Sequence, residues 1–539
     1  MNRLSTFLLP VLLSTVILSC KNAPAPPAPV AEKPVQAVGY DEKHRLQLHF
    51  SPPAKWMNDP NGMFFYEGEW HLFYQHYPDS SVWGPMHWGH AVSTDLVHWQ
   101  NLPIAIYPDS SKFIFSGSAV IDWKNTSGFG TDGKPPLVAM FTIHDQALEK
   151  KGGNSHESQG IAFSNDRGRT WTKFTGNPVI PNPGGVADFR DPKVIWDEAR
   201  AQWVVAIAVG QHDELWHSPD LKKWTKLSEF GTGLGAHDGV WECPDIFPIK
   251  VVGTEETKWA WLVNLNPGNP NGGSGTQYFI GDFDGKNFTI DPDFAKNVQK
   301  GKAVWLDWGK DNYAGVTFSD VPKTDGRRIL MGWMSNWEYA NKVPTEAWRN
   351  AATLPRELIL KKTGAGYRLF SRPVKELEKL RDGTADFLGT EIAGQVDITQ
   401  KLGFAPTYSE WSLEFELPEK LVGRFGIELS NAKNEKYRVG FDASKNAFFS
   451  DRTKSGDLSF SKTFGSKISL ATRSETAKTV KMRVFFDNSS MELFADDGSV
   501  VMTEIFFPTD DFSKINLFAE GGKAVLTKGT AYRLRSAWR

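Results

Sequence analysis

A turn that recurs four times in the first half of the chain restricts its fold more than any other feature. The sequence Ser-Thr-Asp-Leu-Val-His-Trp at residues 93–99 has related copies at 164–171, 218–224 and, more faintly, 281–288. Each copy is a polar turn closed by an aromatic residue, and the spacing of roughly 50 to 70 residues suits one four-stranded propeller blade with long loops. A set of unrelated β-hairpins is the alternative, because such turns are common. Four copies at comparable spacing favour the propeller.

Short apolar and aromatic runs, broken by Gly, Pro, Asn and Asp, fill the chain from Tyr40 onward. This pattern is typical of an all-β protein, and clear examples are residues 63–66, 70–74, 203–208 and 259–263. Long segments with the 3.6-residue periodicity of a helix are nearly absent. We therefore predict an all-β fold.

The character of the chain changes near residues 354–358. The charged stretch at 373–380 predicts a short helical connector. The strands predicted after it alternate apolar and polar residues, which indicates sheets with one face exposed to solvent and hence a β-sandwich. The predicted division is a propeller over 40–370, a connector over 371–384 and a β-sandwich over 385–539.

The first 19 residues are predicted to be a lipoprotein signal peptide. Arg3 precedes an apolar run at 4–18 that is too short to span a bilayer. The run ends in Ile-Leu-Ser-Cys at 17–20, which resembles the lipobox of bacterial lipoproteins and implies cleavage before Cys20 and lipidation of its thiol. An ordinary secretory peptide that happens to contain a cysteine is the alternative.

Residues 20–39 are rich in Pro and Ala and are predicted to be an extended linker, because such a stretch cannot bury a core. With a lipid anchor in the membrane, the protein would be an exported bacterial lipoprotein in the periplasm or on the outer cell surface. With Cys20 lipidated, only Cys243 would remain, so we expect no intramolecular disulfide. The sequence does not indicate an oligomeric state.

The charge balance excludes some partners. The formal net charge is −2, so no basic surface attracts nucleic acid, and a neutral partner fits better. The chain has 21 Trp and 36 Phe. Most of them must pack in the core, but the surplus is also what stacking on sugars requires.

Three short motifs each place a carboxylate among Pro, Gly and aromatic residues. They lie at residues 56–62, 189–192 and 241–245 and contain Asp59, Asp191 and Glu242. Residues so far apart share a site only if the fold brings separate loops together. Two or three converging carboxylates beside tryptophans are what glycoside hydrolysis needs. Each motif alone is as well explained by an ordinary turn.

Local chemistry suggests a different role for each acid. Pro60 and Gly62 fix the direction of Asp59, and a rigidly held ionised carboxylate is suited to be a nucleophile. Apolar neighbours should raise the pKa of Glu242, as a general acid requires. Arg190 is expected to restrain Asp191 in its charged form while Asp191 holds sugar hydroxyls.

Together these motifs resemble those of the β-fructofuranosidases of glycoside hydrolase family 32, which include invertases, inulinases and levanases. The resemblance runs from about Leu46 to the C-terminus and continues in residues 115–118, 333–337, 354–358 and 451–456. It implies a five-bladed β-propeller followed by a C-terminal β-sandwich.

The resemblance also implies catalytic roles. Asp59 would be the nucleophile, Glu242 the acid/base, and Asp191 the residue that stabilises the transition state. The family retains the anomeric configuration through a fructosyl-enzyme ester, without a cofactor. We expect no metal site either, because the candidate histidines fit no zinc spacing and more plausibly have structural roles: His71, His76, His87 and His90.

The fructosyl pocket follows by the same resemblance. The positions expected to hold the substrate are Asn58, Gln75, Trp83, Phe115, Ser116 and Arg190, with Trp333 as an aromatic wall. Core or blade packing is the alternative for Trp83, Trp88 and Trp333. Cys243 is expected to pack against Glu242 rather than react.

The predicted function is a retaining glycoside hydrolase that cleaves β-fructosidic bonds of levan or inulin, and of sucrose. Exo action with fructose release is favoured, because residues 81–90 resemble the levanase and exo-inulinase branch. An endo-levanase, an invertase or a fructosyl transferase would share the same acids. A non-catalytic surface fructan-binding protein would have no need for all three.

Overall fold

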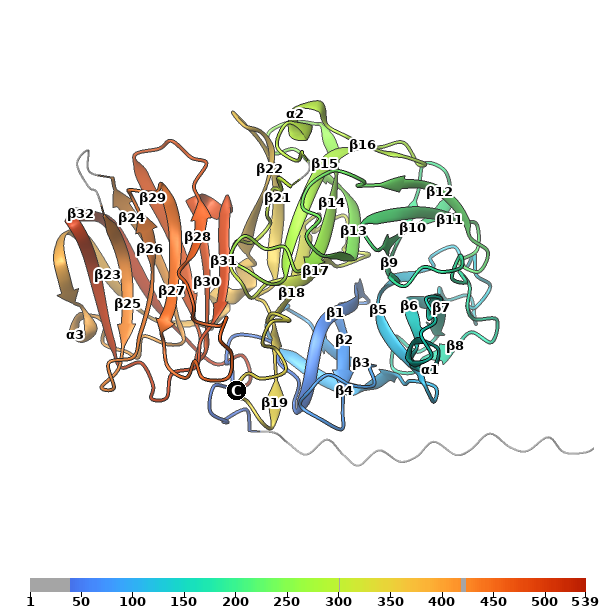
Figure 1. Cartoon of the computed structure of the whole chain (residues 1–539), viewed down its shortest axis with the longest axis horizontal. Helices are drawn as coiled ribbons and strands as arrows, with labels where there is room; N and C mark the ends of the chain where they lie inside the picture. The colour runs from blue at the N-terminus through green and yellow to red at the C-terminus, as the bar shows by residue number, and fades with distance from the viewer. Residues whose placement is uncertain (1–38, 300, 418–422) are drawn as a thin grey trace, which may run out of the picture. The chain divides into compact units, whose positions relative to one another are not determined.

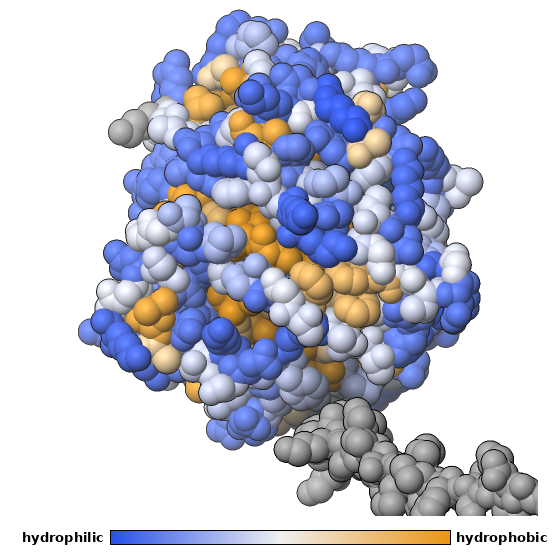
Figure 2. Space-filling model, turned by 90° about the vertical axis from the view of Figure 1, so that its right-hand side faces the viewer, coloured by the Kyte–Doolittle hydropathy of each residue, from blue (hydrophilic) through white to orange (hydrophobic). Residues whose placement is uncertain are grey.

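The computed structural model describes residues 39–299, 301–417 and 423–539 (Figure 1). The predicted signal peptide, Cys20 and nearly all of the predicted linker lie outside the described residues. Strands make up almost all of the regular structure, as the all-β prediction requires. Within the described part of the chain, no helix is long and apolar enough to cross a membrane. The face drawn in Figure 2 is mostly hydrophilic, with hydrophobic side chains gathered in patches between the polar ones.

Five antiparallel sheets follow one another along the chain and form the blades of a propeller (Figure 1). Their first strands contact one another in a closed ring, from β1 through β5, β9, β13 and β17 back to β1. The predicted five-bladed propeller is therefore confirmed. The first three blades are β1 (Lys55–Tyr66), β2 (Glu69–Tyr77), β3 (His87–Ser93) and β4 (Trp99–Ile106); β5 (Lys112–Ile121), β6 (Leu137–Asp145), β7 (Glu157–Ser164) and β8 (Thr172–Lys173); and β9 (Phe189–Asp197), β10 (Gln202–Val209), β11 (His212–Ser218) and β12 (Thr225–Phe230).

The last two blades complete the ring, and two short strands extend it. β19 (Trp348–Arg349) pairs with β1 in parallel and so joins the end of the propeller to its beginning, while β20 (Ala351–Ala352) pairs with β18. Two short helices, α1 (Gln146–Lys150) and α2 (Pro292–Ala295), lie in connections. The two blades are β13 (Val240–Lys250), β14 (Thr257–Asn266), β15 (Gly275–Phe283) and β16 (Phe288–Ile290); and β17 (Tyr313–Thr317), β18 (Arg328–Met334), β21 (Arg356–Thr363) and β22 (Gly366–Pro373).

The repeated turn of the sequence connects the third strand to the fourth in each of the first four blades. In the first copy Asp95 Oδ1 accepts hydrogen bonds from the amides of the next turn residues at 3.1 and 2.9 Å, and the indole of Trp99 donates to a carbonyl inside the turn at 3.1 Å. Asp220 and Trp224 repeat these bonds in the third blade at 2.9, 2.8 and 3.0 Å. A local side-chain to backbone turn therefore marks each of the first four blades.

A 3₁₀ helix, η1 (Lys375–Leu380), leads from the last blade into a β-sandwich, as the fold prediction requires. The long strand β32 pairs with β24 through its C-terminal part and with β25 through its N-terminal part, while β23 follows it along both. The two sheets are thus joined by strands that pass from one to the other. The other elements are β23 (Arg381–Asp397), α3 (Thr399–Leu402), β24 (Ser409–Glu416), β25 (Arg424–Ser430), β26 (Lys436–Asp442), β27 (Ala447–Lys454), β28 (Ser469–Thr472), β29 (Thr479–Phe486), β30 (Ser490–Ala495), η2 (Asp496–Gly498), β31 (Val500–Ile505) and β32 (Lys514–Leu534).

Buried ions tie the sandwich to the propeller. Arg356 of β21 is 0% exposed, and its guanidinium donates to Glu492 of β30 at 2.5 and 3.1 Å and to Asp307 at 2.8 Å. His49, just before β1, bonds Glu492 at 3.0 Å and Asp487 at 2.7 Å. Removing one partner of such a network leaves an uncompensated buried charge, which is strongly destabilising.

The titration of His49 should therefore control stability at alkaline pH. Burial alone would lower the pKa of His49, but Asp487 and Glu492 outweigh burial and raise the pKa to about 9 from the ordinary 6.5. Because the pKa is higher in the folded state, the stabilisation is complete below pH 6.5 and is lost as the pH rises towards 9. We expect His49→Gln to lower the unfolding midpoint in urea much more at pH 6 than at pH 9.5.

His98→Gln is the control, since the side chain of His98 is 49% exposed and lies in a surface turn. It should unfold with the pH dependence of the wild type. Equal loss of stability at both pH values in His49→Gln would contradict the assignment.

Candidate active site

All five inner strands of the propeller are interrupted by a β-bulge. The shifts in register fall at Met57/Pro60 in β1, Ile114/Gly117 in β5, Glu242/Asp245 in β13 and Tyr313/Val316 in β17, and β9 carries one between Arg190 and Lys193. A bulge turns a side chain out of the regular alternation of a strand. The predicted acids lie within or beside these bulges, which explains how distant motifs meet.

Three of the bulges hold a non-glycine residue in the left-handed region. The φ angles are 63° at Asp191, 43° at Cys243 and 51° at Ala314. Such conformations are costly for residues with a Cβ and persist where the surrounding structure enforces them, often at functional sites.

Asp59 is held in one orientation by its neighbours. Ser116 Oγ donates to Asp59 Oδ2 at 2.7 Å, and the Asn58 amide donates to Oδ1 at 3.1 Å. The indole of Trp56 in turn donates to Asn58 Oδ1 at 2.7 Å, which fixes the orientation of the amide. Burial raises the pKa of Asp59, and the hydrogen bonds from Ser116 and Asn58 oppose this rise.

Cys243 lies between two of the acids. Its amide donates to Asp191 Oδ2 at 3.0 Å, and its sulfur lies 3.5 Å from the same oxygen and 3.6 Å from Asp59 Oδ2. Cys243 is buried in an apolar cluster, as expected for a packing residue, and its side chain also lies against the two aspartates. Burial and the nearby carboxylates raise the pKa of the thiol well above its usual range, so it stays protonated.

Arg190 forms its ion pairs with three acids near Asp191. Its guanidinium contacts Asp188 at 2.8 Å, Glu157 at 3.0 Å and Glu242 at 3.3 Å. Burial raises the pKa of Asp191, and the charge of Arg190 offsets this rise only in part. Arg190 therefore favours the charged form of Asp191, as predicted, but does not outweigh burial, and its guanidinium makes its ion pairs with the neighbouring acids.

Glu242 has two donors. One carboxylate oxygen accepts from Arg190, and the other accepts a very short hydrogen bond from the hydroxyl of Tyr313, the first residue of β17. Burial raises the pKa of Glu242 as predicted, while Arg190 and Tyr313 lower it. Tyr313 has no motif around it in the sequence, and only its position at the start of an inner strand could have revealed its role.

The three acids open into one cavity of about 430 Å³. Gln75 uses its amide hydrogens on Asn61 and Ile114, at 2.8 and 3.0 Å, and keeps its carbonyl oxygen for a ligand. Phe115 stacks on His144 with ring centroids 4.2 Å apart. The residues around the cavity are Asn58, Asp59, Gln75, Trp83, Phe115, Ser116, His144, Glu149, His156, Glu157, Asp188, Arg190, Asp191, Glu242, Trp337 and Asn341.

Trp333 does not line this cavity, and its prediction as an aromatic wall is corrected. Its side chain is 0% exposed and packs behind the wall, 4.8 Å from Trp337 between ring centroids. Trp337 occupies the wall position because it follows the end of β18, beyond the buried strand. Trp88 is also fully buried and donates to the carbonyl of Phe115 at 3.0 Å, which fits the packing alternative.

One group of side chains at the rim of the cavity has the spacing of a metal site, but its surroundings do not favour a cation. Donor atoms of His144, His156 and Glu157 lie within 4.8 Å of one another. However, the Arg190 guanidinium contacts Glu157 at 3.0 Å and places a positive charge beside these donors. These side chains are therefore better suited to bind hydroxyl groups than a cation. The four histidines of the first blade bond each other and the backbone, for example His71 to His90 at 3.1 Å.

Comparison with known proteins identifies relatives over nearly the whole chain. Residues 49–373 match the model for the glycosyl hydrolases family 32 N-terminal domain, and residues 376–533 match that for the family 32 C-terminal domain. A levanase of Bacillus subtilis (strain 168) is 46% identical over 501 residues, which span 93% of this chain and 72% of that protein. An extracellular exo-inulinase of Aspergillus awamori is 38% identical over 526 residues, which span 93% and 96%. The crystal structure of an exo-inulinase from Aspergillus awamori has a TM-score of 0.85 at 36% identity, and the match covers 93% of this chain and 100% of that one.

The hydrogen bond from Tyr313 should set the upper pH limit of catalysis. Tyr313→Phe removes a donor that lowers the pKa of Glu242. Without this hydrogen bond the pKa of Glu242 should rise, and we expect the alkaline limb of the pH–rate profile to move to higher pH by about one unit. A hydrogen bond to a charged group contributes about 1.5 kcal/mol or more, and one pKa unit corresponds to about 1.4 kcal/mol. Tyr278→Phe, in the outer part of another blade, should leave the limb in place. A Tyr313→Phe profile that superposes on the wild-type profile would refute this role.

Proposed function

Because the chain belongs to glycosyl hydrolase family 32, we propose that it is a retaining hydrolase that cleaves the β-fructosidic bonds of fructans and releases fructose from the chain end. The observation that carries the proposal is the convergence of Asp59, Asp191 and Glu242 on one cavity, from three different blades. A levanase and an exo-inulinase among the relatives support a fructan substrate and exo action.

Asp59 and Glu242 are proposed to carry out the two-step reaction. Asp59, held by Ser116 and Asn58, attacks the anomeric carbon while the protonated Glu242 gives its proton to the leaving oxygen. A fructosyl ester of Asp59 forms and the rest of the chain departs. Glu242, now a carboxylate, takes a proton from water, whose oxygen bonds the anomeric carbon and releases Asp59.

Asp191 is proposed to bind hydroxyls of the fructosyl unit. Its Oδ2 is held by the Cys243 amide, which leaves Oδ1 for the substrate. Its raised pKa suits this arrangement, since a third full negative charge beside Asp59 and Glu242 would be costly. Phe115, Trp83 and Trp337 offer apolar surface to the sugar ring around it.

Removal of either reacting acid should abolish hydrolysis without unfolding the protein. We expect Glu242→Gln to reduce the rate on levan, inulin and sucrose by about 10²–10⁴-fold, as for loss of a general acid/base. Asp59→Asn should be at least as damaging. Chromatography of early products measures both the rates and the mode of action, with Leu388→Ala on the sandwich surface as a control for expression and purity.

The products also separate the alternatives. Fructose alone at early times supports exo action, whereas early oligosaccharides indicate an endo-levanase. Longer fructosides formed from concentrated sucrose indicate transfer. Binding of fructans without any product would leave only a binding protein and refute the proposal.

Export as a lipoprotein is a second proposal. It rests on the sequence at residues 17–20 and on the Pro/Ala-rich stretch that follows. The relative named an extracellular exo-inulinase supports action outside the cytoplasm. The substrate is a polymer, so an anchored enzyme would meet it at the cell surface or in the periplasm.

We expect Cys20→Ala to move the protein from the membrane fraction to the soluble fraction. Cys243→Ala is the matched control, since it changes the only other cysteine and should leave partitioning unchanged. Immunoblots of fractionated cells measure this, and membrane retention of Cys20→Ala would refute the anchor.

A further inference from the structure

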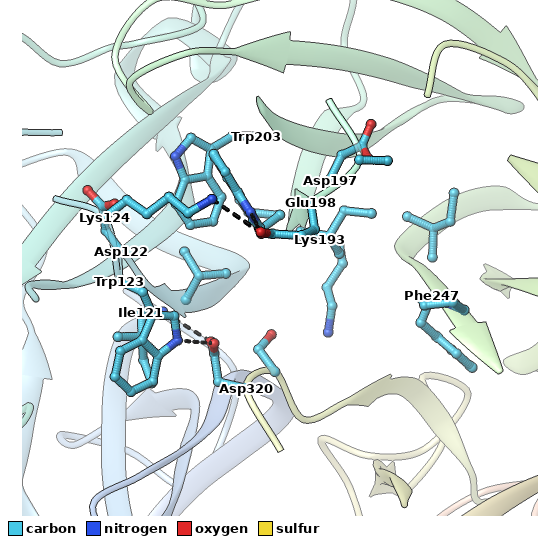
Figure 3. A pocket seen from close by; sticks show the side chains of 18 of the residues that line it. Ile121, Asp122, Trp123, Lys124, Lys193, Asp197, Glu198, Trp203, Phe247 and Asp320 are labelled. Carbon is cyan, nitrogen blue, oxygen red and sulfur yellow. Dashed lines mark hydrogen bonds and ion pairs between the residues drawn. The ribbon is translucent and has the colours of Figure 1, made fainter. Parts of the chain in front are cut away.

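Figure 3 shows a second cavity, of about 570 Å³. It lies at the opposite ends of the inner strands. The catalytic acids occupy the beginnings of β9 and β13, whereas this cavity is lined by the last residues of β5 and β9, the later part of β13 and the β17–β18 connection. It therefore lies at the other end of the inner strands and shares no lining residue with the catalytic cavity.

Trp123 forms a rigid, open platform in this cavity. Its side chain is 61% exposed, which is unusual for a tryptophan. It is nevertheless fixed, because its indole donates to Asp320 Oδ1 at 2.9 Å (Figure 3). Its ring also lies 5.9 Å from that of Tyr66. Asp320 is itself held by the amide of Ile121 at 3.1 Å. A ligand that stacks on this ring would lose little side-chain entropy on binding.

The polar groups of the cavity suit a ligand with hydroxyls. The Arg328 guanidinium lies 4.8 Å above the ring of Phe247, and within the described residues its hydrogen bond is a long one of 3.4 Å to the carbonyl of Phe318. Its remaining donors are thus available to oxygen atoms of a ligand. Ligand pockets are mostly apolar, with a few fixed polar groups that orient the ligand. The ring of Trp123 and the guanidinium of Arg328 provide such an apolar surface and such donors.

The charges of the cavity favour a neutral ligand. Its lining has as many basic as acidic side chains: Lys124, Lys193, Lys323 and Arg328 against Asp122, Asp197, Glu198 and Asp320. Some pair with each other, as Lys124 does with Glu198 at 3.3 Å. A phosphate-bearing or otherwise ionic ligand would find no net opposite charge here.

We propose that this cavity is a second carbohydrate-binding site, which holds a segment of fructan chain away from the catalytic acids. The identity of the polymer rests on the proposed function. A chain held at one end of the inner strands keeps its free end at a high local concentration near the other. The site should therefore lower KM for polymers and leave kcat unchanged, and it should not affect sucrose, which is too small to engage both sites.

Substitution of the platform tests the proposal. We expect Trp123→Ala to raise KM for levan or inulin about tenfold, equal to about 1.4 kcal/mol of lost binding, with kcat and sucrose hydrolysis unchanged. Trp123→Phe keeps an aromatic face, so its KM for the polymers should lie between that of the wild type and that of Trp123→Ala. Leu388→Ala, which removes an apolar side chain that is 70% exposed on the sandwich, should match the wild type. Unchanged polymer KM in Trp123→Ala would overturn the site, provided that its unfolding midpoint matches the wild type.

Binding separates this proposal from the proposed function. In native gels containing levan or inulin, an Asp59→Asn variant should be retarded, and adding Trp123→Ala should remove most of the retardation. Retardation that does not depend on Trp123 would refute the second site even if the enzyme hydrolyses fructans. Conversely, if the Asp59→Asn variant shows Trp123-dependent retardation but the wild-type protein hydrolyses no fructan, the second site is supported and the proposed reaction is refuted.

Discussion

Each inner strand of the propeller loses its regular pairing at the level of the catalytic cavity, and the side chains released there are the ones that build it. A strand directs alternate side chains to opposite faces, so an undisturbed ring of five strands would send most polar groups into the blade packing. The bulges interrupt this alternation. They place Asp59, Ser116, Asp191, Cys243 and Glu242 within reach of one another, although these residues come from four separate blades.

The concentration of acids in the cavity has an electrostatic consequence. Arg190 is the only Lys or Arg side chain among the residues described around it, and it faces six carboxylic acids there. One guanidinium cannot neutralise them all. Burial raises the pKa of Asp59, Asp191 and Glu242, and repulsion from neighbouring acids raises the pKa of Asp191 and Glu242 further. This is the condition under which one acid stays protonated and donates a proton while another remains a nucleophile. The hydrogen bond from the hydroxyl of Tyr313 lowers the pKa of Glu242 and so opposes part of this rise.

The β-sandwich is attached through buried charge as well as apolar packing. Arg356 reaches from the propeller to Glu492, and Arg452 reaches from the sandwich to Asp311 at 2.5 Å. Such ion pairs need close, well-directed partners, since otherwise the cost of removing charges from water exceeds their attraction. These ion pairs fix the position of the β-sandwich against the propeller, so that the five blades and the sandwich of this family 32 protein pack as one unit. The catalytic cavity and the cavity lined by Trp123 lie at opposite ends of the inner strands of the propeller.

The sequence by itself determined the features that depend on close neighbours. The repeated turn was readable because Asp95 and Trp99 bond atoms a few residues away, and the motifs around Asp59 and Glu242 carry their acids in fixed local settings. The tertiary structure decided which distant groups meet. It placed Tyr313 on Glu242, turned Cys243 towards the aspartates, directed Arg190 to Glu157, and put Trp337 rather than Trp333 on the wall. The physical reason is that a single extra residue in a strand reverses the face that its side chains occupy, and a bulge depends on the pairing of strands far apart in the chain.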